Sequence, residues 1–335
     1  MNKVGGLLSI GICITLAPYG QAISASVIPT VFEAGHIFAT PQLVNGSTIR
    51  LLVDTGGGGP WTYWLGQWSP ATRALIKLPP CRIGGDSVEQ FQPPSFLGPA
   101  IPPPIGPCKG ITIVPPENGE ILPFDGMLGA NYLASRGTWT FDYPAQQLTL
   151  EGQDWKPDSK AHPARLGFAS TSFGLRRGMA RLTISVDGKP LDMLLDTGAT
   201  AHPTAETQAA TGDPVVNHEG VTSYITTSMF DRWHRDHPDW LVINMGDDLF
   251  GPHRIMRVIR VPHIEWAGLR LGPVWFTERR DSNFHDMMAS MMDRKPEGAL
   301  GGNVFRHLVL TIDYPRNTAW ITCKENSFCK AVKEH

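Results

Sequence analysis

Short apolar runs separated by turn signals dominate the chain, and two of these runs end in the same way. Residues 49–53 read Ile-Arg-Leu-Leu-Val and residues 191–195 read Leu-Asp-Met-Leu-Leu, and Asp-Thr-Gly follows both. An Asn-Gly pair at 45–46 precedes the first run, and an Asp-Gly pair at 187–188 precedes the second. An apolar run after such a pair predicts the second strand of a β-hairpin. Each half of the chain is therefore expected to present an Asp-Thr-Gly turn at a strand end.

Two further segments follow each turn in the same order. Residues 125–131 read Asp-Gly-Met-Leu-Gly-Ala-Asn, and residues 297–303 read Glu-Gly-Ala-Leu-Gly-Gly-Asn. Further along, Phe-Asp-Tyr-Pro at 141–144 is matched by Ile-Asp-Tyr-Pro at 312–315. The chain therefore contains an internal repeat, which predicts two units of similar design.

The repeat predicts where the two units begin and end. The polar, proline-containing stretch 151–165 lies between the copies and has the composition of a linker. We expect an N-terminal lobe over residues 26–150 and a C-terminal lobe over residues 166–335. A chain of 335 residues is long enough for two such units, each with its own core.

The composition favours a protein built mainly of β-strands. The chain has 35 glycines and 29 prolines, and only 18% of its residues are charged, which suits many short strands joined by turns. The formal net charge is -2 and the basic residues are scattered, so the sequence has no patch for nucleic acid or an anionic membrane. Nucleic acid is therefore not an expected partner.

The first 25 residues are predicted to be a signal peptide. A lysine near the start precedes an apolar stretch over residues 4–16, which is too short and too rich in glycine to span a bilayer comfortably. A lipid attached at Cys13 is the alternative, but Ile12 is bulky where such sites need a small residue. We expect a periplasmic or secreted protein without stable membrane insertion after cleavage.

The cysteines and histidines are candidates for disulfides or for metal binding. Four cysteines follow the predicted signal peptide: Cys81, Cys108, Cys323 and Cys329. An even number in an oxidising compartment favours two disulfides; the nearest pairs in sequence are 81 with 108 and 323 with 329, and other pairings stay open. Zinc is the competing use, but no Cys-x-x-Cys pair occurs.

His234 and His237 have the spacing of two ligands on a helix, yet a surface helix explains them equally well and no zincin glutamate follows. No metal or other cofactor is expected.

Each residue type in the two turns has a chemical task. The candidates form two matched sets: Asp54, Thr55 and Gly56, and Asp196, Thr197 and Gly198. The aspartates supply carboxylates, and the glycines have no side chain that would keep backbone N–H groups away from them. The threonine hydroxyls can form hydrogen bonds to the opposite turn and join the two loops. Two such turns predict one site with a pair of carboxylates.

In these motifs the sequence resembles the aspartic protease clan, with features of both pepsin-like and retropepsin-like members. Residues 194–200 read Leu-Leu-Asp-Thr-Gly-Ala-Thr, which is the retropepsin-like form, and both halves carry the apolar-apolar-glycine segment that ends at Gly129 and Gly301. The first half is similar to pepsin because Trp61 stands seven positions after the first aspartate, although residues 56–59 are all glycine instead of serine-rich.

The resemblance implies an all-β, bilobed acid-protease fold with a few short helices, in which two β-barrel-like lobes flank a cleft for an extended polypeptide. It implies an aspartic endopeptidase whose catalytic residues are Asp54 and Asp196. Two carboxylates about 3 Å apart share one proton, so one acts as a base towards water and the other as an acid towards the scissile carbonyl. The supporting loop residues would be Thr55, Gly56, Thr197, Gly198, Gly129 and Gly301, with Trp61 in the substrate cleft.

Three alternatives stay open at this stage. A non-catalytic peptide-binding module could use the same fold, because a fold does not dictate a function; such a module would have no need for two matched turns. Lobes could pair between chains, as in retroviral enzymes, although two unlike halves in one chain make a monomer the simpler expectation. An exported structural β protein would make the repeated turns accidental.

Overall fold

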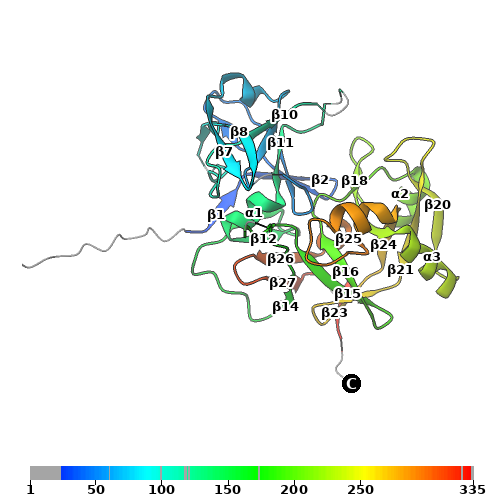
Figure 1. The fold of residues 1–335 in the computed structure, drawn as a ribbon. Helices are drawn as coiled ribbons and strands as arrows, with labels where there is room; N and C mark the ends of the chain where they lie inside the picture. The colour runs from blue at the N-terminus through cyan, green and yellow to red at the C-terminus, as the bar shows by residue number, and fades with distance from the viewer. Residues whose placement is uncertain are drawn as a thin grey trace, which may run out of the picture.

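The computed structural model describes residues 24–332 apart from residues 60, 99, 117, 118, 120, 173 and 326. All but the last two residues of the predicted signal peptide lie outside the described part. Strands dominate the described residues, with a few short helices (Figure 1). No described helix has the length and apolar character needed to cross a membrane.

A six-stranded sheet forms the first half of the protein. Its strands, in spatial order, are β10 (Thr112–Val114), β6 (Trp64–Gly66), β11 (Gly126–Gly129), β5 (Leu51–Asp54), β3 (His36–Ala39) and β2 (Thr30–Glu33). Strand β5 comes from the apolar run 49–53 and is buried along its whole length. It pairs antiparallel with β3 on one side and parallel with β11 on the other. A central strand with two neighbours explains why its sequence is apolar without alternation.

A ten-stranded sheet forms the second half. Its strands, in spatial order, are β20 (Val242–Asp247), β21 (Met256–Val261), β24 (Val274–Arg279), β19 (Ser223–Thr226), β25 (Gly298–Leu300), β16 (Lys189–Leu195), β15 (Arg181–Val186), β22 (Ile264–Trp266), β23 (Leu269–Leu271) and β28 (Cys329–Ala331). The order β15, β16, β25, β19, β24 repeats the order β3, β5, β11, β6, β10, and each corresponding pair has the same direction. The repeat in the sequence is therefore a repeat in strand topology.

A third sheet joins the two halves. It consists of β1 (Ser26–Ile28), β13 (Gln147–Leu150), β12 (Thr138–Asp142), β26 (Leu308–Asp313), β27 (Thr318–Cys323) and β14 (His162–Arg165). Strands β12 and β26, which contain the first residues of the two Asp-Tyr-Pro segments, pair antiparallel at its centre. Strand β14 lies at the end of the stretch 151–165 and pairs with β27. Fully buried side chains of the central strands, including Trp139, Phe141 and Ile312, contribute to a core shared by both halves.

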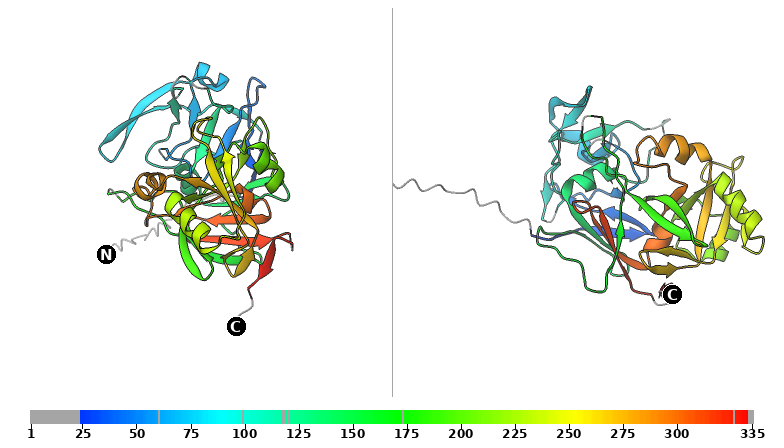
Figure 2. Two further views of the ribbon diagram at one scale, coloured as in Figure 1. Left: turned by 90° about the vertical axis from the view of Figure 1, so that its right-hand side faces the viewer. Right: turned by 60° about the horizontal axis from the view of Figure 1, so that its bottom comes forward.

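Short helices and hairpins complete the fold. Helix α1 (Ala130–Arg136) directly follows β11, and α4 (Gly302–Phe305) begins two residues after β25. The hairpin of β7 (Lys77–Ile83) and β8 (Asp86–Phe91) projects from the first half (Figure 2). The remaining elements are β4 (Gln42–Leu43), β9 (Phe96–Leu97), β17 (Thr200–Ala201), β18 (Gly220–Val221), α2 (Ala205–Thr211), α3 (Thr227–Asp236), a 3₁₀-helix (Pro70–Ala74) and a π-helix (Asn283–Met288).

The expected fold class and disulfides are both confirmed. The chain is mainly β, with two topologically equivalent halves, as the resemblance implied. Cys81 of β7 is bonded to Cys108, and Cys323 at the end of β27 is bonded to Cys329 of β28. These are the pairs nearest in sequence.

Candidate active site

Equivalent strands position the two predicted carboxylates. Asp54 is the last residue of β5, and Asp196 directly follows β16. The parallel neighbour of each strand fixes its end: Gly129 lies opposite Asp54 in the β5–β11 register, and the N–H of Asp196 donates to the Leu300 carbonyl at 3.0 Å. Leu300 precedes Gly301, where a Cβ would lie 1.8 Å from the Thr222 carbonyl oxygen. The predicted Leu-Gly segments therefore lie directly beneath the two turns.

The structure brings Asp54 and Asp196 together. A Cβ atom added at Gly56 would lie 2.3 Å from the carboxyl carbon of Asp196, and one added at Gly198 would lie 2.3 Å from that of Asp54. Each turn glycine is therefore packed against the carboxyl group of the opposite half, and any side chain at the glycine position would displace that carboxyl group. The two carboxyl groups are close enough for each to affect the pKa of the other.

The threonines of the two turns form a symmetric set of hydrogen bonds between the halves. The Thr55 hydroxyl donates to the Leu195 carbonyl at 2.9 Å and accepts from the N–H of Thr197 at 3.0 Å. The Thr197 hydroxyl donates to the Val53 carbonyl at 2.8 Å and accepts from the N–H of Thr55 at 3.1 Å. Both threonines have no exposed surface. These four bonds, which we call the threonine grip, hold the two turns in one relative position.

Burial and mutual repulsion dominate the electrostatics of the pair. Burial raises the pKa of Asp54, while backbone N–H donors lower it; Gly56 and Gly57 donate to the same oxygen at 2.8 and 2.7 Å. Burial, followed by the negative charge of Asp54, raises the pKa of Asp196 well above its ordinary range. The backbone N–H groups of Gly198, at 3.0 Å, and Ala199 offset this rise in the pKa of Asp196 only in part. Asp54 is therefore the better stabilised anion.

A buried histidine from the first half supports the second turn. His36 in β3 contacts the Thr200 hydroxyl through Nε2 at 2.9 Å, and that hydroxyl donates to the Gly198 carbonyl at 2.9 Å. Because the single hydroxyl proton of Thr200 is used there, Nε2 of His36 is the donor to it. Burial lowers the pKa of His36 to about 4, so the ring is neutral at neutral pH. Sequence reasoning missed this residue, since one histidine in an apolar strand carries no signal.

A cavity of ≈ 320 Å³ lies along the continuation of the first Asp-Thr-Gly turn. The predicted cleft residue Trp61 is part of its wall, and its indole N–H donates to the Arg176 carbonyl at 3.0 Å. Four parts of the chain form the wall: the loop after the first turn, the β7–β8 hairpin, α1 and the segment 171–177. The residues that line the cavity are Gly59, Trp61, Ile83, Asp86, Val88, Asn131, Thr171, Ser172 and Arg177. Its mixture of aromatic, aliphatic and polar groups can accommodate a side chain of an extended peptide.

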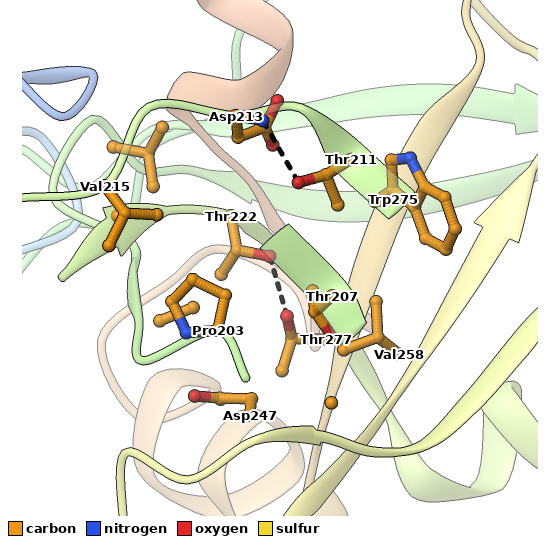
Figure 3. Close-up of a pocket in the computed structure, with 14 residues that line it drawn as sticks. Pro203, Thr207, Thr211, Asp213, Val215, Thr222, Asp247, Val258, Trp275 and Thr277 are labelled. Carbon is orange, nitrogen blue, oxygen red and sulfur yellow. Dashed lines mark hydrogen bonds between the residues drawn. The ribbon is translucent and has the colours of Figure 1, made fainter. Parts of the chain in front are cut away.

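A second cavity lies inside the second half and is too small for a substrate (Figure 3). Its volume of ≈ 20 Å³ is enough for about one water molecule. The Thr222 and Thr277 hydroxyls meet beside it at 2.7 Å, and Asp247 forms part of its wall. We therefore assign it to the packing of this lobe.

The histidine pair His234 and His237 belongs to the surface end of α3. His237 bonds to Asp187 at 2.7 Å and stacks on Trp240, with ring centroids 4.1 Å apart. This arrangement accounts for His237 as a surface ion pair and a packing contact.

Comparisons with known proteins give likeness in structure only. The chain is similar to the crystal structure of an aspartic proteinase from Irpex lacteus, with a TM-score of 0.48 and 12% identity over 93% of this chain and 100% of that chain. It is also similar to the crystal structure of basic 7S globulin from soybean, with a TM-score of 0.47 and 10% identity over 90% and 95% of the two chains. No protein-family model and no curated protein matches the sequence. The assignment of the fold therefore rests on strand order and pairing.

Proposed function

We propose that this protein is an exported aspartic endopeptidase that hydrolyses peptide bonds with a water molecule activated between Asp54 and Asp196. The observation that carries this proposal is the mutual packing of the two carboxyl groups, each against the turn glycine of the opposite half. Burying two acidic groups in contact is costly, and structures retain such arrangements mainly where chemistry requires them. A binding module would gain nothing from that cost.

The electrostatics support a shared proton and a division of roles. Two close carboxyl groups cannot both ionise easily, so the pair keeps one proton over a broad range of pH. The two backbone donors on one Asp54 oxygen favour the charge there, so Asp196 holds the proton. Asp54 then takes a proton from water as the water attacks the scissile carbon. Asp196 gives its proton to the carbonyl oxygen, and a tetrahedral diol forms without a covalent enzyme intermediate. The C–N bond then breaks as Asp196 takes a proton from a diol hydroxyl and Asp54 gives its proton to the leaving nitrogen, which restores the starting protonation of the pair.

The surroundings of the pair suit an extended polypeptide substrate. The β7–β8 hairpin contributes Ile83, Asp86 and Val88 to the cavity that also contains Trp61. A peptide bound beneath this hairpin would have one side chain in the cavity and its scissile bond over the carboxyl pair. Export is supported by the two disulfides, which are typical of oxidising compartments. A single chain supplies both catalytic turns, so the active form is a monomer.

The test is peptide cleavage by the purified full chain and by the variants Asp54→Asn and Asp196→Asn across pH 3 to 7. Wild type should cleave an unstructured protein substrate, and each variant should lose more than about 10³-fold in kcat, because half of the acid–base pair is missing. Asp142→Asn is a matched control, since its carboxylate lies in a turn and accepts from the Ala145 N–H at 3.0 Å. Peptide binding without cleavage by wild type would favour the non-catalytic module, and full cleavage by either active-site variant would refute the assignment.

A further inference from the structure

Two histidines and two carboxylates converge on the surface of the second half. His218 Nε2 lies 2.9 Å from Asp248 Oδ1, and His202 Nδ1 lies 4.0 Å from the same oxygen. His202 Nε2 lies 3.7 Å from Glu219 Oε1. The potential ligand atoms of His202, His218 and Asp248 are all within 4.8 Å of one another, which within the described part of the chain occurs at this place alone.

Backbone groups join two of the three segments that carry these side chains. The N–H of Asp248 donates to the His202 carbonyl at 3.0 Å, and the N–H of His202 donates to the carboxylate of Asp247 at 2.8 Å. That carboxylate also forms a buried ion pair with Arg279 at 2.7 Å. Figure 3 shows Asp247 next to the small cavity, close to Pro203. The segment that contains His202 and the segment that contains Asp248 are thus fixed to each other before any ligand binds.

A tight hairpin turn directs His218 and Glu219 towards the same place. Val216 and Glu219 exchange two backbone hydrogen bonds of 2.9 Å, and the two residues between them have positive φ angles, 51° at Asn217 and 70° at His218. A left-handed backbone is unusual for a histidine, and such geometry needs support from its surroundings. The contact of its ring with Asp248 is one such support.

We propose that His202 (through Nδ1), His218 and Asp248 bind a zinc ion with water as the fourth ligand, while Glu219 contacts the other ring nitrogen of His202 and orients the ring. Two imidazoles with carboxylates suit Zn²⁺, whereas Ca²⁺ and Mg²⁺ prefer oxygen ligands alone. Zinc bonds of about 2.0–2.1 Å place tetrahedral ligands roughly 3.3 Å apart. The distances from the Asp248 oxygen to the nitrogens of His218 and His202, 2.9 and 4.0 Å, bracket that spacing, so small rotations of these partly exposed side chains complete the site.

The site would fasten the 216–219 hairpin next to the second catalytic turn. His202 follows Thr200 by two residues, and Thr200 is the residue that receives the His36 hydrogen bond and supports Gly198. Zinc bound to His202 would therefore stiffen the strand that leads out of this turn. The proposal concerns metal binding and stands whether or not the chain is a protease.

The test is isothermal titration of the chelator-treated full chain with ZnCl₂, compared with CaCl₂. Wild type should bind one Zn²⁺ per chain and no Ca²⁺, and Zn²⁺ should raise its thermal midpoint. His202→Ala, Asp248→Asn and His218→Asn should each weaken Zn²⁺ binding by more than about tenfold, since even outer-shell changes at zinc sites cost 10–100-fold. Asparagine is chosen at 218 because it tolerates the left-handed backbone and the side chain there is 51% exposed.

His237→Ala is the matched control, because it removes a histidine from another His–Asp pair, with Asp187 at 2.7 Å, that is outside the group of three potential ligands found among the described residues. It should bind Zn²⁺ like wild type. Co²⁺ absorption gives an independent readout, since nitrogen ligands in a tetrahedral site produce visible bands that the His218→Asn variant should lose. Binding that is absent in wild type, or unchanged in both histidine variants, or reduced equally in the control, overturns the proposal.

Discussion

Removal of one hydroxyl from the threonine grip should weaken the union of the two halves by a calculable amount. The change Thr55→Ala deletes an oxygen that donates to the Leu195 carbonyl and accepts from the Thr197 N–H. Both partners lie where water does not reach, since neither Leu195 nor Thr197 has exposed surface. A buried polar group left without a partner costs about 1–3 kcal/mol, so two such groups cost about 2–6 kcal/mol.

That loss is large compared with the total stability of a folded domain, which is about 5–15 kcal/mol. Equilibrium unfolding in urea at pH 7, followed by tryptophan fluorescence, measures it as a fall in the free energy of unfolding. Thr55→Ser is the control, because it keeps the hydroxyl and loses one methyl group, at a cost of about 1 kcal/mol. Thr197→Ala should behave like Thr55→Ala, because the two hydroxyls make equivalent bonds.

The order expected for stability is wild type, then Thr55→Ser, then the two alanine variants. An alanine variant within about 0.5 kcal/mol of wild type would show that the grip does not contribute as inferred. A serine variant as unstable as alanine would also refute the reasoning, because the methyl group and not the hydrogen bonds would then carry the stability.

Three further predictions concern ionisation and disulfides. Burial lowers the pKa of the folded-state His36 to about 4, so as pH falls the unfolded chain takes up this proton before the folded chain does. The free energy of unfolding of wild type should therefore fall by about 3 kcal/mol between pH 6.5 and 4. In urea titrations, His36→Gln should show a weaker dependence on pH. Because the folded state raises the pKa of Asp196, the contribution of this residue to stability is present at low pH and is lost as pH rises. Asp196→Asn should therefore have a higher melting temperature than wild type at pH 7, and the difference should shrink towards pH 4. Replacing Cys81 and Cys108 by alanine opens a loop of 27 residues and should lower the free energy of unfolding by about 3–4 kcal/mol. A loss below about 1 kcal/mol would contradict this prediction.

The sequence could predict the paired elements because each repeat unit contains its own local signals. Turn dipeptides, apolar strands and Asp-Thr-Gly occur close together, and their duplication makes chance agreement improbable. The location of Asp54 and Asp196 at equivalent strand ends follows from such local order. Their mutual contact depends on the pairing between β12 and β26. The matching Asp-Tyr-Pro segments indicated that these strands are equivalent, but not that they pair with each other.

The rest of the site depends on contacts between distant segments and had no signal in the sequence. His36 and Thr200 are 164 positions apart, and nothing local to either residue indicates that they meet. The convergence of His202, His218 and Asp248 likewise comes from three separate segments without a ligand-spacing motif. The histidine pair that did have regular spacing, at 234 and 237, is the surface feature for which packing is a sufficient explanation.

The antiparallel pairing of β12 with β26 has a consequence for the order of events during synthesis. Residues 138–142 must wait for residues 309–313 before their sheet can close. A ribosome makes the first carboxylate long before the strands that hold the second, and contacts between such remote segments form late. The two aspartate-bearing turns of the nascent chain therefore meet only after the strands of both halves have been synthesised.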